Sequence, residues 1–118
     1  MDGYSNQTTK YRINGTLLPQ YQGKNVCLLG YVIQRDPNGM SFKLKASDNQ
    51  IVVIQMKEPI QDSLEGLVEV QGTVTPRNSV LCDHYIEFPT DMASNFDANL
   101  YNEAVQLMAR YPNYYITF

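Results

Sequence analysis

Apolar and polar residues alternate over two stretches of the chain, residues 40–47 and 66–75. In the first stretch the apolar residues all fall at alternate positions: Met40, Phe42, Leu44 and Ala46. In the second stretch valines alternate in the same way with Glu69, Gln71 and Thr73. A period of two is typical of a strand that buries one face. The pattern therefore predicts two strands and directs Phe42 into a core.

Three more stretches are short, apolar and bounded by turn residues, which is typical of buried strands. They span residues 26–34, 50–56 and 79–88. Gly30 lies in the middle of the first stretch, and a glycine inside a strand indicates a bulge or a sharp bend. Turn residues follow at 36–39, 48–49 and 76–78. The connection over 57–65 contains Pro59 and is too short for more than about one turn of helix.

The order of these strands predicts the fold class. Three strands, one connection and two further strands precede a helical segment, so the chain is all-β with a helical appendage. A five-stranded OB-fold Greek-key barrel with a C-terminal α-helix fits this order. An SH3-like barrel also has five short strands and is the main alternative, but the length of these strands and the glycine in the first one favour the OB-fold.

The chain divides into three predicted parts. We expect a disordered N-terminal tail over residues 1–11, an OB-fold barrel over 12–95, and a C-terminal oligomerisation helix with its tail over 96–118. The first part is rich in small polar residues, which cannot form a packed core. Before the first predicted strand, residues 14–18 are expected to form one helical turn, with Asn14 as its N-cap and Pro19 at its end.

The C-terminal helix is the most informative segment, because its apolar surface is too wide for one neighbour. Asp97 is its predicted N-cap, and the helix ends at or before Tyr111 because Pro112 disfavours a helical residue ahead of it. At 100° per residue the bulky apolar side chains span about 160°, against about 100° or more for a helix buried on one side. They form two flanks, with Ala104 between them: Leu100, Leu107 and Tyr111 on one, and Tyr101, Val105 and Met108 on the other.

We predict that these seven residues form a subunit interface. Burying a large apolar side chain contributes about 1.5–3 kcal/mol, so exposing both flanks would cost much of a typical domain stability of about 5–15 kcal/mol. The pattern leaves open which flank faces the barrel and which faces a partner. It also leaves open whether this helix plugs the end of its own barrel, or whether Leu17, Leu18 and Tyr21 do. The aromatic tail over residues 111–115 either extends the interface or folds back over the barrel.

Composition narrows the classes of function. The 118-residue chain has a formal net charge of −3 and a sequence pI of about 4.9, so its overall field does not attract nucleic acid. No apolar run is long enough to span a membrane, and the first residues lack a basic, apolar signal, so we expect a soluble intracellular protein. Cys27 and Cys82 are expected to be buried free thiols.

Direct contact with DNA is expected to be weak and confined to phosphates. Binding without sequence preference requires aromatic side chains for base stacking beside a basic groove. Tyr31 and Tyr85 are the only strand aromatics that the pattern leaves available, and the turns between strands are too short to clasp a nucleic acid strand. Four cations are the candidates for phosphate contact: Arg35, Lys43, Lys45 and Arg77.

The sequence predicts a protein that is not an enzyme and binds no metal or cofactor. His84 is the only histidine, and no second histidine or cysteine lies at metal-ligand spacing from it. The neighbouring Asp83 falls on the opposite face of the strand, so the two side chains do not form an acid–base pair. The sequence contains no glycine-rich phosphate loop and no nucleophile motif.

Particular stretches resemble the smallest subunit of replication protein A, the eukaryotic single-stranded-DNA-binding heterotrimer. They are Arg12-Ile13-Asn14 with Leu18-Pro19-Gln20-Tyr21, Gly23-Lys24 and Val26-Cys27; residues 66–72 (GLVEVQG); and residues 100–105 (LYNEAV). The similarity runs from about residue 12 to residue 115, and the LYNEAV run is its most specific part. The longer, polar N-terminal tail departs from the family.

The resemblance implies a structural subunit whose C-terminal helix joins helices of the middle and large subunits in a three-helix bundle. It also implies a nuclear protein of DNA replication, repair and recombination, which meets single-stranded DNA mainly through the complex. Two alternatives remain at this point. One is a self-sufficient OB-fold module that binds oligonucleotides alone. The other is the small OB subunit of a telomere-capping complex, which the LYNEAV run disfavours.

Overall fold

The structure, a computed structural model, describes residues 10–60 and 63–111. Its elements, in chain order, are β1 (Tyr11–Ile13), the 3-10 helix η1 (Leu18–Tyr21), β2 (Asn25–Arg35), β3 (Ser41–Ala46), β4 (Ile51–Met56), β5 (Leu67–Val74), β6 (Val80–Glu87), α2 (Thr90–Ser94) and α3 (Ala98–Arg110). Of the tail predicted to be disordered over residues 1–11, residues 1–9 lie outside the described residues, whereas Lys10 is in a β-bridge and Tyr11 begins β1. The predicted role of the aromatic tail beyond Tyr111 also lies outside them. None of the described helices is long and apolar enough to cross a membrane.

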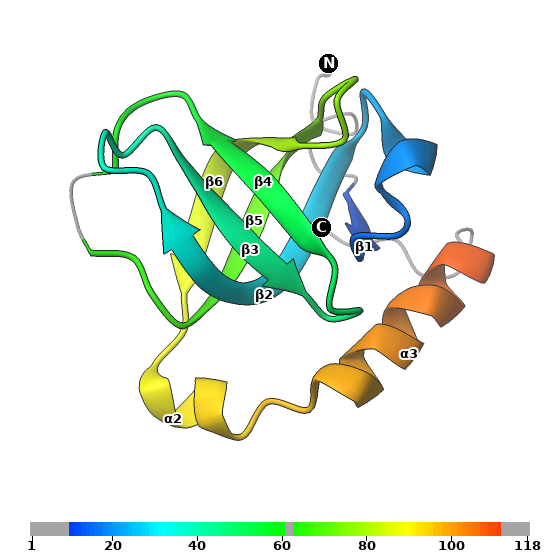
Figure 1. Ribbon diagram of the computed structural model, residues 1–118. Helices are drawn as coiled ribbons and strands as arrows, with labels where there is room; N and C mark the ends of the chain where they lie inside the picture. The colour runs from blue at the N-terminus through cyan, green and yellow to red at the C-terminus, as the bar shows by residue number, and fades with distance from the viewer. Residues whose placement is uncertain (1–9, 61–62, 112–118) are drawn as a thin grey trace, which may run out of the picture.

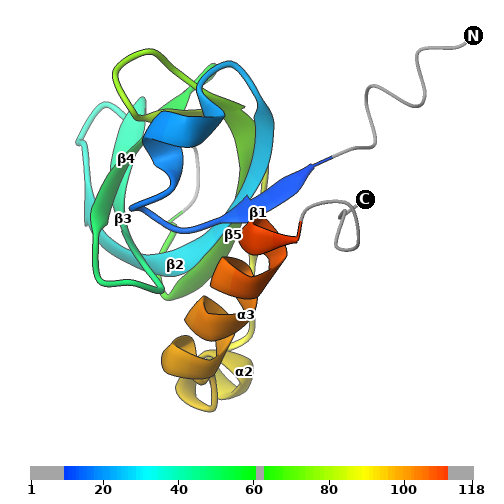
Figure 2. The ribbon, with the colours of Figure 1, turned by 90° about the vertical axis from the view of Figure 1, so that its right-hand side faces the viewer.

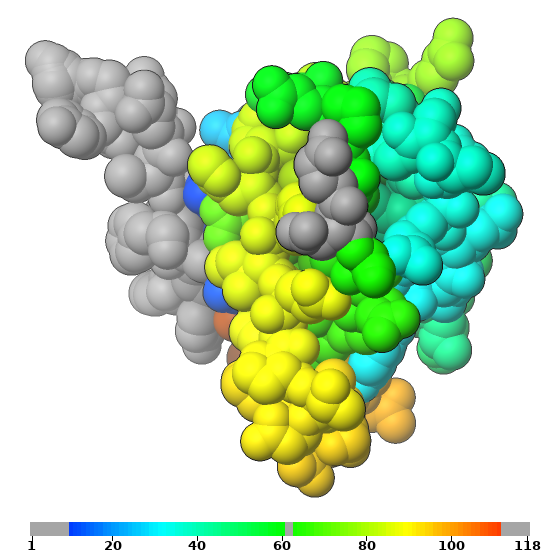
Figure 3. All heavy atoms as spheres, turned by 90° about the vertical axis from the view of Figure 1, so that its left-hand side faces the viewer, coloured from blue at the N-terminus to red at the C-terminus, as the bar shows by residue number. Residues whose placement is uncertain are grey.

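The five predicted strands are β2 to β6, and each predicted boundary lies within one residue of the observed one. They close into a barrel, because β2 pairs antiparallel with β3 on one side and with β5 on the other, while β4 pairs parallel with β6 (Figure 1). This arrangement confirms the predicted OB-fold barrel with its C-terminal helix. Viewed from the left-hand side of Figure 1, the residues of α2 project below the barrel (Figure 3).

Two short elements were not predicted. β1 adds to the barrel in parallel with β2, with Tyr11 opposite Val26 and Ile13 opposite Leu28. Its three residues carry too little pattern to indicate a strand, and it exists because β2 offers it a free backbone edge. The second is α2, a single short helix between the barrel and α3.

The prediction that Pro19 ends a helical turn was wrong. Asn14 does accept a hydrogen bond from the backbone N–H of Leu17 through Oδ1, at 3.1 Å, so it caps a turn as expected. Pro19 lies in the first turn of η1, which continues to Tyr21. A proline is tolerated there because the N–H that it lacks would have no partner inside the helix.

The core lies inside the barrel and includes Phe42, which is 2% exposed, as its alternation predicted. Leu18 of η1 and Leu64 of the β4–β5 connection belong to the same cluster, and Leu17 and Tyr21 pack against it. Val105 of α3 is fully buried but lies outside this cluster. The residues around η1 therefore complete the core, and α3 does not plug the barrel.

Gly30 lies where β2 pairs with two strands at once, opposite Ala46 of β3 and Val68 of β5. A Cβ atom at this position would lie 2.3 Å from the carbonyl oxygen of Lys45. Only glycine permits this close approach of two backbones. The predicted irregularity of this strand is also present, but as a register shift between Val32 and Gln34.

We predict that Gly30→Ala lowers the free energy of unfolding by at least about 1–3 kcal/mol, because the new methyl group meets backbone that cannot rotate away. Gln34→Ala on the exposed part of the same strand is the matched control and is expected to change stability by no more than about 0.5 kcal/mol. Urea denaturation followed by circular dichroism measures both. Equal stability of the two variants would contradict this account of Gly30.

Candidate functional site

α3 lies against the outside of the barrel, next to β1 (Figure 2). The helix begins as predicted, since Oδ1 of Asp97 accepts a hydrogen bond from the N–H of Leu100 at 3.0 Å. Tyr111 is the residue at its C-terminal cap. Because α3 has the bounds that the sequence predicts, the positions of its two apolar flanks relative to the barrel wall can be compared directly with the helical pattern.

The flank that contains Val105 faces the barrel. Val105 is 0% exposed, and Tyr101 and Met108 are partly buried on either side of it. This settles the question that the helical pattern left open. Of the seven predicted interface residues, Val105 is therefore fully engaged within the chain, whereas Tyr101 and Met108 keep part of their surface exposed.

A first polar cluster links this flank to β1 and β5. Nη1 of Arg12 donates hydrogen bonds to Oε1 of Glu69 at 3.1 Å and to the hydroxyl of Tyr101 at 3.2 Å. Nε2 of Gln71 donates to the other oxygen of Glu69 at 2.9 Å. Burial raises the pKa of Tyr101 above its usual value, and Arg12 opposes this effect. Burial lowers the pKa of Arg12, but Tyr101 and Glu69 more than compensate, so the guanidinium stays charged.

A second polar cluster surrounds Asn102. Oδ1 of Asn102 accepts hydrogen bonds from Nδ2 of Asn14 at 2.8 Å and from the hydroxyl of Ser47 at 3.1 Å. Asn14 and Ser47 are only 2% and 7% exposed. Because an unpaired buried polar group is costly, α3 satisfies these two groups when it docks.

Aromatic side chains extend this contact to α2. The ring of Phe96 packs between Tyr31 and Tyr101, with centroid distances of 6.2 and 5.6 Å. The hydroxyl of Tyr31 donates to the carbonyl oxygen of Ala93 at 2.6 Å. Tyr31 is thus engaged in holding α2 and the following linker on the barrel and is not available for base stacking.

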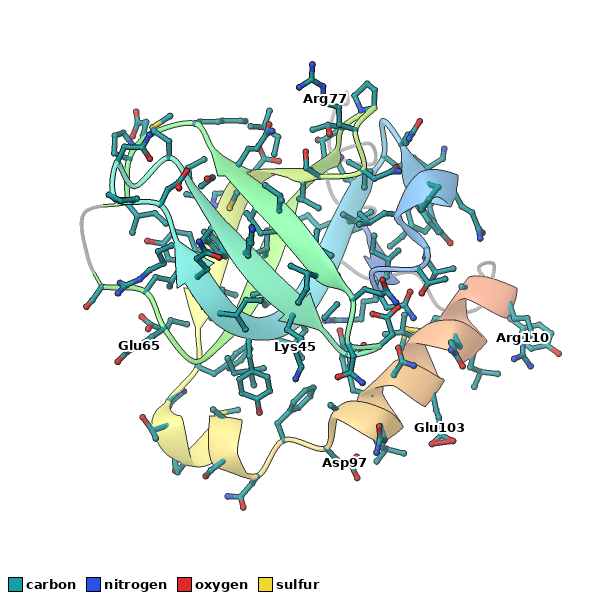
Figure 4. The ribbon with its side chains drawn as sticks, in the orientation of Figure 1. Lys45, Glu65, Arg77, Asp97, Glu103 and Arg110 are labelled. Carbon is teal, nitrogen blue, oxygen red and sulfur yellow. The ribbon has the colours of Figure 1, made fainter. Side chains whose placement is uncertain are left out.

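The other flank of α3 faces away from the barrel. Leu100, Leu107 and Tyr111 are 64%, 43% and 49% exposed, whereas Ala104 between them is partly buried. The spacing of 4, 3 and 4 residues from Leu100 through Ala104 and Leu107 to Tyr111 is typical of a seam between packed helices. Glu103 and Arg110 project from the same helix into solvent (Figure 4). We call Leu100, Ala104, Leu107 and Tyr111 the outer seam.

The four candidate cations do not form one patch. Lys43 and Lys45 lie exposed on the outer face of β3, whereas Arg77 lies in the turn between β5 and β6 at the opposite end of the barrel from Lys45 (Figure 4). Arg35 ends β2. On β4 the cross-strand neighbours of the two lysines are Val53 and Ile51. On β2 Lys45 lies opposite Tyr31, whose hydroxyl already donates to the carbonyl oxygen of Ala93, so this aromatic neighbour of the pair is engaged with α2.

Among the described residues no group of three or more His, Cys, Asp or Glu side chains could hold a metal ion. Asp83 pairs with Lys57. Cys27 and Cys82 are free and buried, and burial raises the pKa of both thiols, that of Cys82 to about 11. Leu100, Leu107 and Tyr111 of the outer seam are three of the large apolar residues exposed in the described chain; the others are Ile33, Met40, Ile51, Val53, Ile86 and Met92.

Comparison with known proteins agrees with this arrangement. The family model described as Replication factor A protein 3 matches residues 5–115 of the chain. Among solved structures, the chain is similar to a chain of U. maydis replication protein A bound to ssDNA, with 28% sequence identity and a TM-score of 0.75. The match covers 92% of this chain and 97% of that chain, so the similarity takes in nearly the whole length of both.

We predict opposite results for two aliphatic residues of α3. Val105→Ala removes buried methyl groups and should lower the stability of α3 docking by about 1–3 kcal/mol. Leu100→Ala removes more apolar surface from an exposed site and should change it by less than about 0.5 kcal/mol. Hydrogen exchange of the α3 amides measures docking directly. Faster exchange in the Leu100 variant than in the Val105 variant would contradict the assignment of the two flanks.

Proposed function

The chain belongs to the Replication factor A protein 3 family, and we propose that it serves as a structural subunit of the replication protein A single-stranded-DNA-binding complex. In this proposal the outer seam of α3 packs against helices of the middle and large subunits in a three-helix bundle. The protein acts in the nucleus, in DNA replication, repair and recombination, and it carries no catalytic activity. The family assignment favours this function over a subunit of a telomere-capping complex.

The exposure of the outer seam is the observation that carries the proposal. Leu100 and Leu107 lie about two turns apart on the same flank and are 64% and 43% exposed, although the other flank already packs on the barrel. A contiguous exposed apolar strip on a helix marks an interaction site. An amphipathic helix that offers such a strip packs most readily against other helices, since their ridges and grooves match its own.

We further propose that the barrel touches DNA only through phosphates, within the complex. Lys43 and Lys45 form no ion pair among the described residues, so their charges are available. Their neighbours on β4 are Val53 and Ile51, and the ring of Tyr31, opposite Lys45 on β2, packs against Phe96, so we expect base stacking to contribute little. Arg35 lies opposite Phe42, the neighbour of Lys43, and could extend their contact, whereas Arg77 at the other end of the barrel would add at most a separate one (Figure 4).

The assembly is tested by changing the seam. Leu100→Ser combined with Leu107→Ser should abolish or strongly weaken the complex, because each leucine contributes at least about 1.5 kcal/mol on burial and two together correspond to roughly a 100-fold change in Kd. The variant is co-expressed with the middle and large subunits, and the complex is measured by size-exclusion chromatography with light scattering.

Asn99→Ser combined with Gln106→Ser on the polar face of α3 is the matched control and should assemble normally. Circular dichroism should show an intact barrel in both variants. A seam variant that still elutes as the full complex would overturn the proposed interface.

The phosphate contacts are tested by reversing two charges. Lys43→Glu combined with Lys45→Glu should weaken binding of the assembled complex to a fluorescent oligonucleotide at low salt. It should also reduce the salt slope by about 1.4, since each single-strand phosphate contact contributes about 0.7. Lys24→Glu, at an exposed position away from β3, is the control. Fluorescence anisotropy with the same affinity and slope for all three complexes would exclude the two lysines as contacts.

A further inference from the structure

The two flanks of α3 are nearly equal in apolar character, yet only one of them packs on the barrel. The outer seam carries two leucines and a tyrosine, whereas the inner flank carries Tyr101, Val105 and Met108. The hydrophobic effect depends on the area removed from water and not on direction. Apolar burial alone would therefore allow the helix to dock on its own barrel with Leu100 and Leu107 facing inward.

The barrel wall beneath α3 is not purely apolar, and this distinguishes the two flanks. Arg12, Glu69, Asn14 and Ser47 reach this surface from β1, β5 and the ends of β1 and β3. Asn14, Ser47 and Glu69 are 2%, 7% and 9% exposed. Their partners on the helix are Tyr101 and Asn102, whose side chains leave the helix on either side of Val105.

Two directional contacts on either side of a buried residue fix how far a helix is rotated about its axis. At 100° per residue the centres of the two flanks lie about 100° apart. A rotation of that size would bring Leu100 and Leu107 to the barrel and carry Tyr101 and Asn102 away from it. Asn14 and Ser47, which are buried, would then lose their hydrogen-bond partner Asn102, and Arg12 would keep only Glu69.

We propose that Tyr101 and Asn102 are positioning residues, which set the rotation of α3 and thereby keep the outer seam facing solvent. The proposal rests on the proposed function only where it says that the outer seam binds other subunits. The rotation of α3 itself does not depend on that function. Both residues lie within the LYNEAV run, together with Leu100 and Ala104 of the seam and the buried Val105. One short stretch of sequence thus contains both residues of the outer seam and the residues whose hydrogen bonds orient it.

Distance measurement on the full free chain tests the rotation without any partner. One nitroxide label is placed at Gln106 on α3, and a second at the exposed barrel positions Lys24 and Gln55 in turn. The native Cys27 and Cys82 are 1% and 3% exposed and do not compete for the label. Tyr101→Phe combined with Asn102→Ala keeps the aromatic ring but removes both polar contacts.

In the parent chain we expect one distance from each barrel position. In the Tyr101→Phe/Asn102→Ala variant we expect a second population, displaced by up to about 8 Å, because a rotation of about 100° moves a side chain that far around a helix of this radius. Tyr31→Phe is the matched control, since it removes a tyrosine hydroxyl that holds α2 and not α3. It should keep the parent distance.

A rescue variant separates a changed rotation from a loosened helix. Adding Leu100→Ser and Leu107→Ser to Tyr101→Phe/Asn102→Ala removes the apolar flank that competes for the barrel, so the parent distance should return. Asn102→Ala alone provides a milder variant should the combined one lose its circular dichroism spectrum. An unchanged distance in the folded variants, or a broad distribution that the seam substitutions do not restore, would overturn the proposal. Neither result depends on whether the chain assembles with other subunits.

Discussion

Pairing of β2 with three other strands is the constraint on which the rest of the structure depends. β2 joins β3 and β5 to close the barrel, and it also holds β1 in parallel at its N-terminal half. Arg12 lies in β1 and Asn14 follows it, so both depend on this pairing for their position. These two residues make the hydrogen bonds that reach Tyr101 and Asn102 of α3. The direction of the outer seam therefore depends on a strand of three residues.

The docking of α3 combines a small apolar contact with well-directed polar ones. Val105 is the only residue of the helix that is fully buried. A contact of this size stabilises the helix on the barrel but specifies its orientation poorly, because several arrangements bury similar apolar area. Hydrogen bonds to buried groups specify orientation well, because a wrong arrangement leaves those groups without partners. The polar residues beneath α3 thus fix the orientation of the helix on the barrel, and the apolar residues contribute to the free energy of docking.

The barrel itself is better suited to support than to binding. OB-folds that bind nucleic acid alone combine a basic groove with stacking aromatics. Here Phe42 belongs to the core, Tyr31 holds Ala93 and Tyr85 packs against the core, while the chain carries a net charge of −3. In this member of the replication factor A protein 3 family, the exposed apolar surface suited to binding a partner therefore lies on α3, which follows the barrel.

Sequence alone determined the features that depend on neighbouring residues. Alternation with a period of two located β3 and β5, turn residues bounded every strand of the barrel, and Asp97 with Pro112 bounded α3, because each of these signals acts within a few residues. The helical pattern identified the seven candidate interface residues of α3 and its C-cap but could not divide them between barrel and solvent. That division depends on Arg12 and Asn14, which lie 89 and 88 residues before their partners Tyr101 and Asn102. β1 escaped prediction for the same reason, since three residues form a strand only where β2 offers an edge. Only the tertiary structure decided which flank faces outward, because buried polar groups on the barrel select the flank and their positions exist only after the barrel has closed.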